Sequence, residues 1–103
     1  MVMTILEAQV APEQWVMLEA EFHKAVAAPE RRAAGLDQCF LLHSTADPSV
    51  WRILSVWRSH EALDATRSAN PTPVAVQMFR AAGAEPALSI FDIPVSFGGC
   101  QGE

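Results

Sequence analysis

The stretch VWRILSVWRSHEAL, residues 50–63, contains the strand-to-helix junction on which the fold prediction depends. Its first eight residues are rich in β-branched and aromatic side chains, which favour a strand. Ser59 is a preferred N-cap residue, so a short helix is expected over residues 61–68. The run from Trp57 to His60 also holds an Arg, and two interpretations are open: a reaction site, or only the corner where the strand turns into the helix.

Similar signals predict the other elements on both sides of this junction. An apolar stripe at helical spacing and the punctuation supplied by Pro and Gly mark two further helices, with Thr72 and Gly83 as caps of the second. The expected strands cover residues 2–10, 35–43, 50–57 and 87–95, and the expected longer helices cover residues 12–28 and 73–82. The stripe of the first helix consists of Trp15, Leu18, Phe22 and Val26. The order β-α-β-β-α-β predicts an α+β, ferredoxin-like fold with an antiparallel four-stranded sheet and helices on one face.

Length and composition restrict the class of protein. The 103 residues fit one domain, expected over residues 1–96, with a loose tail over residues 97–103. A net charge of −5 and only seven Lys and Arg argue against a nucleic-acid partner. No apolar run is long enough to cross a membrane, and no export signal is visible, so we expect a cytoplasmic protein. Cys39 and Cys100 lack the spacing of a disulfide framework, a zinc ribbon or a redox pair.

The third expected strand is apolar on both faces. One face would hold Trp51, Ile53, Ser55 and Trp57, and the other would hold Arg52, Leu54, Val56 and Arg58. Helices on one side of a sheet leave its other face uncovered. We therefore expect a homodimer in which two copies pack their sheets face to face. An Arg buried there needs a carboxylate, for which Glu7 and Asp92 are the candidates.

The segments VWRILSVWRS, HEALDATRSA and PVAVQMFRAAGAEPALSIFDI resemble the antibiotic-biosynthesis-monooxygenase-like family over residues 2–95. The resemblance implies a dimeric α+β barrel with one pocket per subunit between the sheet and its helices. It also implies two activities, cofactor-independent oxidation of aromatic polyketides or degradation of haem. Trp57 matches the family's strand-end Trp, which faces that pocket. Many members have Glu where this chain has Ser55, and the haem-degrading branch has its ligand His where this chain has Arg67, which disfavours haem degradation.

Candidate catalytic residues are His43, as a base near neutral pH, and Trp57, as a pocket wall. Each has a plain alternative, a satisfied or surface His and a core Trp. Candidate substrate-binding residues are Phe22, His23, Trp51, Ser55, Trp57, Gln77, Met78 and Arg80. Among these, Trp51 is also expected in the core, and His23 and Arg80 on the surface. His60 is expected to face water.

Three functions remain open at this point. The first is a monooxygenase without cofactor or metal, acting on a hydrophobic, aromatic small molecule. The second is a non-catalytic, dimeric small-molecule-binding protein, and the third is a structural dimer with a closed core. No metal site is predicted, because the three His lack a ligand-like spacing.

Overall fold

The computed structural model describes residues 1–28, 34–69 and 73–95. The predicted order of elements is confirmed. The elements are β1 (Val2–Gln9), the 3-10 turn η1 (Pro12–Gln14), α1 (Trp15–Ala27), β2 (Leu36–His43), β3 (Val50–Trp57), α2 (His60–Ala69), α3 (Val74–Ala81) and β4 (Ala87–Asp92). The predicted tail and the predicted cap at Thr72 lie outside the described residues.

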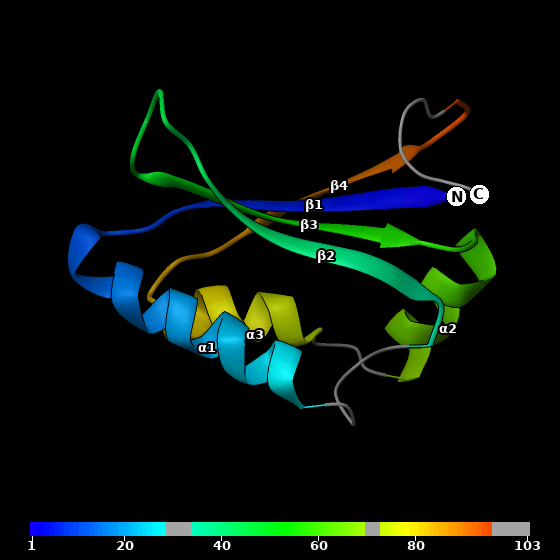
Figure 1. Ribbon diagram of the computed structural model, residues 1–103, viewed down its shortest axis with the longest axis horizontal. Coiled ribbons are helices and arrows are strands. Elements are labelled where there is room, and N and C mark those ends of the chain that lie inside the picture. Colours follow the sequence, from blue (N-terminus) through cyan, green and yellow to red (C-terminus); the bar gives the residue numbers. More distant parts are fainter. Residues whose placement is uncertain (29–33, 70–72, 96–103) are drawn as a thin grey trace.

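The four strands form one sheet in the order β2-β3-β1-β4, and every neighbouring pair is antiparallel. All the described helices lie on one side of this sheet (Figure 1). This is the ferredoxin-like α+β fold that the sequence predicts. In Figure 1, α1 and α3 lie side by side under one part of the sheet, and α2 lies at the end where β3 stops.

Local signals in the sequence account for the helix boundaries. The Ser59 hydroxyl accepts a hydrogen bond of 3.1 Å from the backbone N–H of Ala62, which is the predicted cap of α2. Gly83 has φ +77°, a left-handed conformation that ends α3 and that glycine adopts without strain. The last strand ends at Asp92 rather than at residue 95, and Pro94 follows within two residues and has no N–H for the ladder.

The strand register gives the sheet an inner face, toward the helices, and an outer face. In the two central strands every inner residue is buried: Val2, Thr4, Leu6, Ala8, Trp51, Ile53, Ser55 and Trp57. On the expected stripe of α1, Leu18 is fully buried, whereas Val26 borders the space between helix and sheet and has an exposed fraction of 65%. Val26 lies on the last turn of α1, where the helix no longer covers the sheet closely enough to bury it.

The buried inner residues form two separate hydrophobic clusters. The main cluster includes Leu6, Trp51 and Ile53 and packs under α1 and α3. The end cluster consists of Val2, Trp57 and Leu63, with Leu36 packed against it, and lies under α2. Thr4 and Ser55 are the only buried polar residues among those described, and they lie on the strands between the two clusters.

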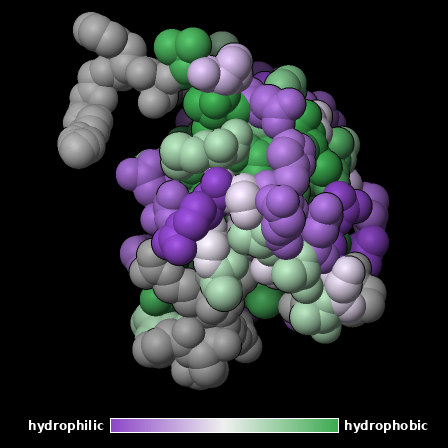
Figure 2. All heavy atoms as spheres, turned by 90° about the vertical axis from the view of Figure 1, so that its right-hand side faces the viewer, coloured by the Kyte–Doolittle hydropathy of each residue, from purple (hydrophilic) through white to green (hydrophobic). Residues whose placement is uncertain are grey.

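The outer face of the sheet is largely apolar and has no cover within the described chain. Large side chains on it are substantially exposed, with fractions of 45% for Phe40, 39% for Leu42 and 51% for Phe91. Figure 2, a view onto the end where α2 lies, shows hydrophobic residues gathered toward the top, the side of this outer face. Arg52 meets Glu7 at 2.6 Å across the strands, as expected. Arg58 pairs instead with Asp37 at 3.6 Å.

Asp92 does not serve the outer face, contrary to the expectation. It lies opposite Val2 in the register, which places it on the inner face. Its carboxylate contacts Nε2 of His60 at 2.5 Å, at the start of α2. His60 is exposed, as expected, and this contact joins α2 to the edge strand β4.

Candidate functional site

A cavity of about 1450 Å³ lies between the sheet and the helices, in the interval between the two hydrophobic clusters. Its floor comes from the inner faces of all four strands, and its sides come from α1, α2 and α3. Apolar side chains make up most of the wall. They include Phe22, Leu63, Met78, Leu88 and Ile90. Because the helices are grouped at two separate places along the sheet, the described helices do not fill the space between the two groups.

Three small polar side chains cross the floor of the cavity in one row, which we call the floor row: Thr4, Ser55 and Cys39. The register places Thr4 directly opposite Ser55, and Ser55 directly opposite Cys39. Thr4 and Ser55 are each 8% exposed, and the Sγ of Cys39 lies 3.5 Å from the Oγ of Ser55. The floor row is therefore a band of neutral polar groups in an otherwise apolar floor.

Trp57 forms the end wall of the cavity, beside the floor row. Its indole N–H donates a hydrogen bond of 3.1 Å to the Oγ1 of Thr4, and both groups are buried. An indole N–H in a buried site needs such a partner, because an unpaired donor is costly. This contact fixes both the indole plane and the Thr4 rotamer. Trp57 thus faces the cavity. The next residue, Arg58, follows the end of β3, borders the same cavity and pairs with Asp37.

Cys39 is a protonated thiol under ordinary conditions. Burial raises its pKa above the usual range, because the thiolate would lose hydration, and the hydrogen bond with Ser55 partly offsets this effect. The floor row therefore carries no charge near neutral pH. It offers hydrogen bonds rather than a base or a nucleophile.

Charged side chains also border the cavity: Asp37, Arg58, Asp64, Arg67, Arg80 and Glu85. Arg80 donates two hydrogen bonds to Glu85, from Nε at 3.2 Å and from a terminal nitrogen at 3.0 Å. These bonds raise the pKa of Arg80 and lower that of Glu85. Arg67, at the end of α2, also borders the cavity, and no ion pair of it is found within the described part of the chain. Binding of an anionic substrate by Arg80, a candidate substrate-binding residue, would thus compete with an existing carboxylate partner.

His43 lies in a different place from Trp57. It is opposite Trp51 in the register, six residues before Trp57 on β3, so about 20 Å separates the two positions. Its ring stacks on Trp51 with centroids 4.0 Å apart, and meets the edge of Trp15 at 4.7 Å. Its Nε2 donates to the carbonyl of Pro48 at 2.7 Å. The two expected catalytic residues therefore do not share one site.

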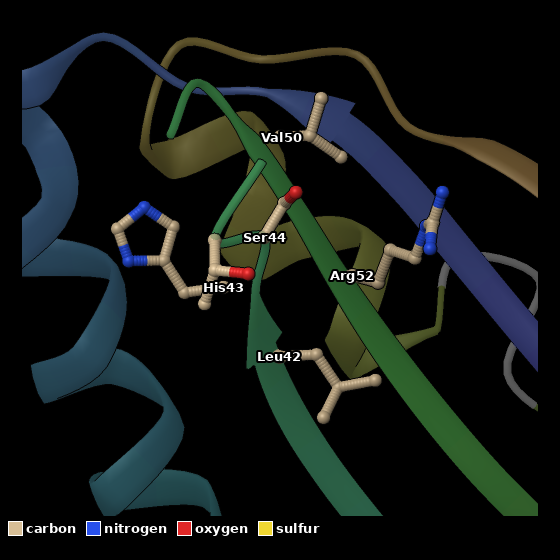
Figure 3. A pocket seen from close by; sticks show the side chains of 6 residues that line it. Leu42, His43, Ser44, Val50 and Arg52 are labelled. Carbon is tan, nitrogen blue, oxygen red and sulfur yellow. The ribbon is translucent and has the colours of Figure 1, made fainter. Parts of the chain in front are cut away.

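A smaller hollow of about 260 Å³ borders His43 at this end of the sheet. Figure 3 shows the His43 ring turned away from the side chains of Leu42, Val50 and Arg52, which line the same hollow. This hollow therefore has no imidazole directed into it. The His43 ring belongs to an aromatic stack with Trp15 and Trp51.

The structure divides the expected substrate-binding residues into two groups. Phe22, Ser55, Trp57, Met78 and Arg80 border the cavity. Trp51, His23 and Gln77 do not: Trp51 is 2% exposed within the main cluster, and the other two lie on exposed helix faces. The indole nitrogen of Trp51 is buried and has no hydrogen-bond partner in the described part of the chain.

Sequence reasoning missed two residues of the floor row, Thr4 and Cys39. The alternation of the strands did place both on the same face as Ser55 and Trp57 in principle. What it could not supply was the register between strands. Within residues 1–28, 34–69 and 73–95, no group of three His, Cys, Asp or Glu is arranged to hold a metal. No helix there is long and apolar enough to cross a membrane.

The fold and the cavity define a ferredoxin-like domain with a large open cavity between its sheet and its helices. The sequence profile of the family named "Antibiotic biosynthesis monooxygenase" matches residues 1–81. The chain belongs to this family. A comparison with curated protein sequences found no match.

Solved structures with the same fold include three informative neighbours. A Deinococcus radiodurans protein, named provisionally as an antibiotic biosynthesis monooxygenase, has a TM-score of 0.73 at 14% identity and covers 98% of this chain and 100% of its own. SnoaB of Streptomyces nogalater, a cofactor-independent oxygenase, has a TM-score of 0.68 at 18% identity, covering 95% and 97%. Rv0793 of Mycobacterium tuberculosis has 0.66 at 20%, covering 95% and 98%. At these identities the likeness establishes the fold alone.

Proposed function

We propose that this protein is a monooxygenase that uses neither metal nor organic cofactor and acts on a hydrophobic, aromatic small molecule. The observation that carries the proposal is the large, mostly apolar cavity with Trp57 at its end and the neutral floor row beside it. Such a site suits a flat, electron-rich ring. A member of the same fold, SnoaB, is described as a cofactor-independent oxygenase.

The reaction class follows from what the cavity holds. An activated methylene between aromatic rings reacts with O₂ to give a ketone and water, so the substrate supplies all four electrons. In our proposal the protein contributes an apolar enclosure, a fixed ring orientation against Trp57, and hydrogen bonds from the floor row. A ligand that fills the cavity displaces water from it, which strengthens those hydrogen bonds because competing solvent is removed.

The test uses 1,8-dihydroxy-9-anthrone as substrate, with O₂ consumption and quinone absorbance as readouts after subtraction of the uncatalysed rate. We expect Trp57→Ala to lower kcat/KM at least tenfold. Trp15→Ala is the matched control, since its indole also donates to an acceptor, the carbonyl of Val10 at 3.0 Å, but lies outside the cavity. Turnover no faster than the uncatalysed rate, across a panel of anthrones and quinols, would count against the proposal.

A second candidate, a non-catalytic small-molecule-binding protein, is favoured by one observation. None of the three His borders the cavity among the described residues, so no imidazole is placed there to act as a base. This protein would be stabilised thermally by an aromatic ligand, without O₂ consumption or product. The anthrone assay, run beside a thermal shift measurement, separates the two candidates.

We also propose that the protein acts as a homodimer joined through the outer sheet face. Members of the family typically dimerise. The exposed Phe40, Leu42 and Phe91 on this face support the proposal, because a large apolar sheet face is rarely left to solvent. The Arg52–Glu7 pair lies on the same face, so its charges would enter the interface already neutralised. Light scattering at micromolar concentration tests this, and a stable monomer would contradict it.

A further inference from the structure

The floor row has more hydrogen-bond donors than its own hydrogen bonds use. An indole nitrogen is a donor only, so in the Trp57–Thr4 contact the Thr4 oxygen must accept. The proton of the Thr4 hydroxyl is then still available. No acceptor for it is found within the described part of the chain, although the residue is 8% exposed.

The other two members of the floor row leave a second proton available. Ser55 and Cys39 contact each other at 3.5 Å, and whichever one donates, the other keeps its proton. The three side chains therefore carry three protons, of which their mutual contacts use one. The row is a net donor, and its members border the cavity.

We infer that Thr4, Ser55 and Cys39 form a binding site for an oxygen atom of an aromatic ligand, which we call the ligand-oxygen site. In it the Thr4 hydroxyl, held in place by Trp57, donates a hydrogen bond to the hydroxyl or phenolate oxygen of the ligand. The row crosses three adjacent strands and spans about 10 Å, which is comparable with the edge of a fused-ring aromatic. The apolar walls on both sides contact the rings of the ligand, and the floor row donates hydrogen bonds to its oxygen atoms.

The charges around the floor row determine whether it binds a hydroxyl, a phenolate or a carboxylate of the ligand. Three cations border the cavity, Arg58, Arg67 and Arg80, and none of them contacts the floor row within the described part of the chain. Arg58 is paired with Asp37, and Arg80 is paired with Glu85. A carboxylate placed on the floor would lose its hydration without gaining a counter-charge, which is costly. A hydroxyl, or a phenolate whose charge is delocalised into the ring, loses much less. The site therefore selects hydroxylated aromatics over aromatic carboxylates.

This inference rests on the proposed function only in placing the ligand in the same cavity. Isothermal titration with 2-naphthol and with naphthalene isolates the oxygen, because the two ligands share their apolar area. We expect the wild-type protein to prefer 2-naphthol, and 2-naphthoate to bind more weakly than 2-naphthol. Thr4→Val should remove about three- to tenfold of the naphthol preference and leave naphthalene affinity unchanged. Thr4→Ser, which keeps the hydroxyl, should retain the preference.

Thr66→Val is the matched control, since the Thr66 hydroxyl lies on the α2 side of the cavity but already donates to the carbonyl of Ala62 at 3.1 Å. Its naphthol-to-naphthalene affinity ratio should stay at the wild-type value. If Thr4→Val does not fold, Ser55→Ala decides, because it leaves the Trp57–Thr4 bond intact and should lower the same ratio.

Three results would overturn the inference. The first is equal affinity of the wild-type protein for both ligands, and the second is a naphthol preference that Thr4→Val and Ser55→Ala leave unchanged. Either result would refute the ligand-oxygen site without contradicting the oxygenase proposal. The third is absence of binding for both ligands, which would refute both the ligand-oxygen site and the proposal that the substrate is aromatic. Conversely, a naphthol preference that depends on Thr4, without anthrone turnover, would support the ligand-oxygen site and favour the second candidate function, a non-catalytic small-molecule-binding protein.

Discussion

Replacing Thr4 with Val tests the hydrogen bond that joins β1 to the end of β3. The bond links residues 53 positions apart in the chain, and the side chains of Thr4 and Trp57 are both 8% exposed. Val has nearly the shape of Thr, so the change leaves almost no void. What it removes is the acceptor, and the indole N–H of Trp57 is left unpaired.

The expected magnitude follows from that geometry. A buried donor without a partner costs about 1–3 kcal/mol. The cavity beside Trp57 admits water, which partly satisfies the indole, and the added methyl group of Val gains some apolar burial. We therefore expect Thr4→Val to lower the free energy of unfolding by about 1–2 kcal/mol. For a domain of this size the midpoint of thermal unfolding should fall by roughly 5–10 °C.

Urea unfolding followed by tryptophan fluorescence measures this loss, at one protein concentration so that any dimer contributes equally. The double variant Thr4→Val/Trp57→Phe should lose about 0.5–1.5 kcal/mol less than the sum of the single variants, because both partners are then absent. Thr66→Val, whose hydroxyl bonds within its own helix, should stay within about 0.5 kcal/mol of wild type. A Thr4→Val protein as stable as wild type, with additive double-variant losses, would refute the role of this bond.

Three further predictions concern the outer face, the thiol and the Arg80–Glu85 pair. Phe40→Glu should convert a dimer to a monomer in light scattering, because it places a charge in the proposed apolar interface; an unchanged dimer would rule out this face. The rate at which iodoacetamide alkylates Cys39, measured against pH by peptide mass spectrometry, should have its midpoint at a pH above the usual thiol pKa, because burial raises the pKa of Cys39. Ser55→Ala should move this midpoint higher still, since the hydrogen bond that lowers this pKa is lost. A midpoint below the usual thiol pKa would contradict the burial argument. Because the pKa of Glu85 is lowered by Arg80, their pair should persist at neutral pH and be lost only as the pH falls through that lowered value. Glu85→Gln should therefore tighten binding of naphthalene-2-sulfonate severalfold at neutral pH and low salt, and unchanged affinity would show that Arg80 does not reach the ligand.

Much of the fold could be predicted because its signals are local. Ser59 and Gly83 mark helix ends through bonds and dihedral angles that involve only a few neighbouring residues. Alternation along residues 50–57 fixed which side chains share a face, and so placed Trp57 inward. The same alternation indicated that both faces are apolar. Val26 shows the limit of such patterns, because helical spacing does not reveal where a helix stops covering the sheet.

The candidate site was only partly predictable, because it depends on how distant segments align. His43 was a reasonable base by chemistry, but its position opposite Trp51 puts it about six residues along the strand from Trp57. Asp92 was assigned to the outer face, yet the register of β4 turns it inward to His60. Neither relation is visible in the local sequence, since a shift of one residue in register reverses the face of every side chain.

By itself, the sequence determined the order of the elements, the two faces of each strand and the inward position of Trp57. These depend on periodicity and capping, which act over a few residues. The tertiary structure alone decided that Thr4, Ser55 and Cys39 form one row, because that row joins residues 16 and 51 positions apart through strand register. It also decided that the helices gather in two groups and leave the cavity between them. Of the Trp–Arg–Ser–His run, Trp57 and Arg58 border the cavity, and the hydrogen-bond partner of Trp57, Thr4, comes from a strand elsewhere in the chain.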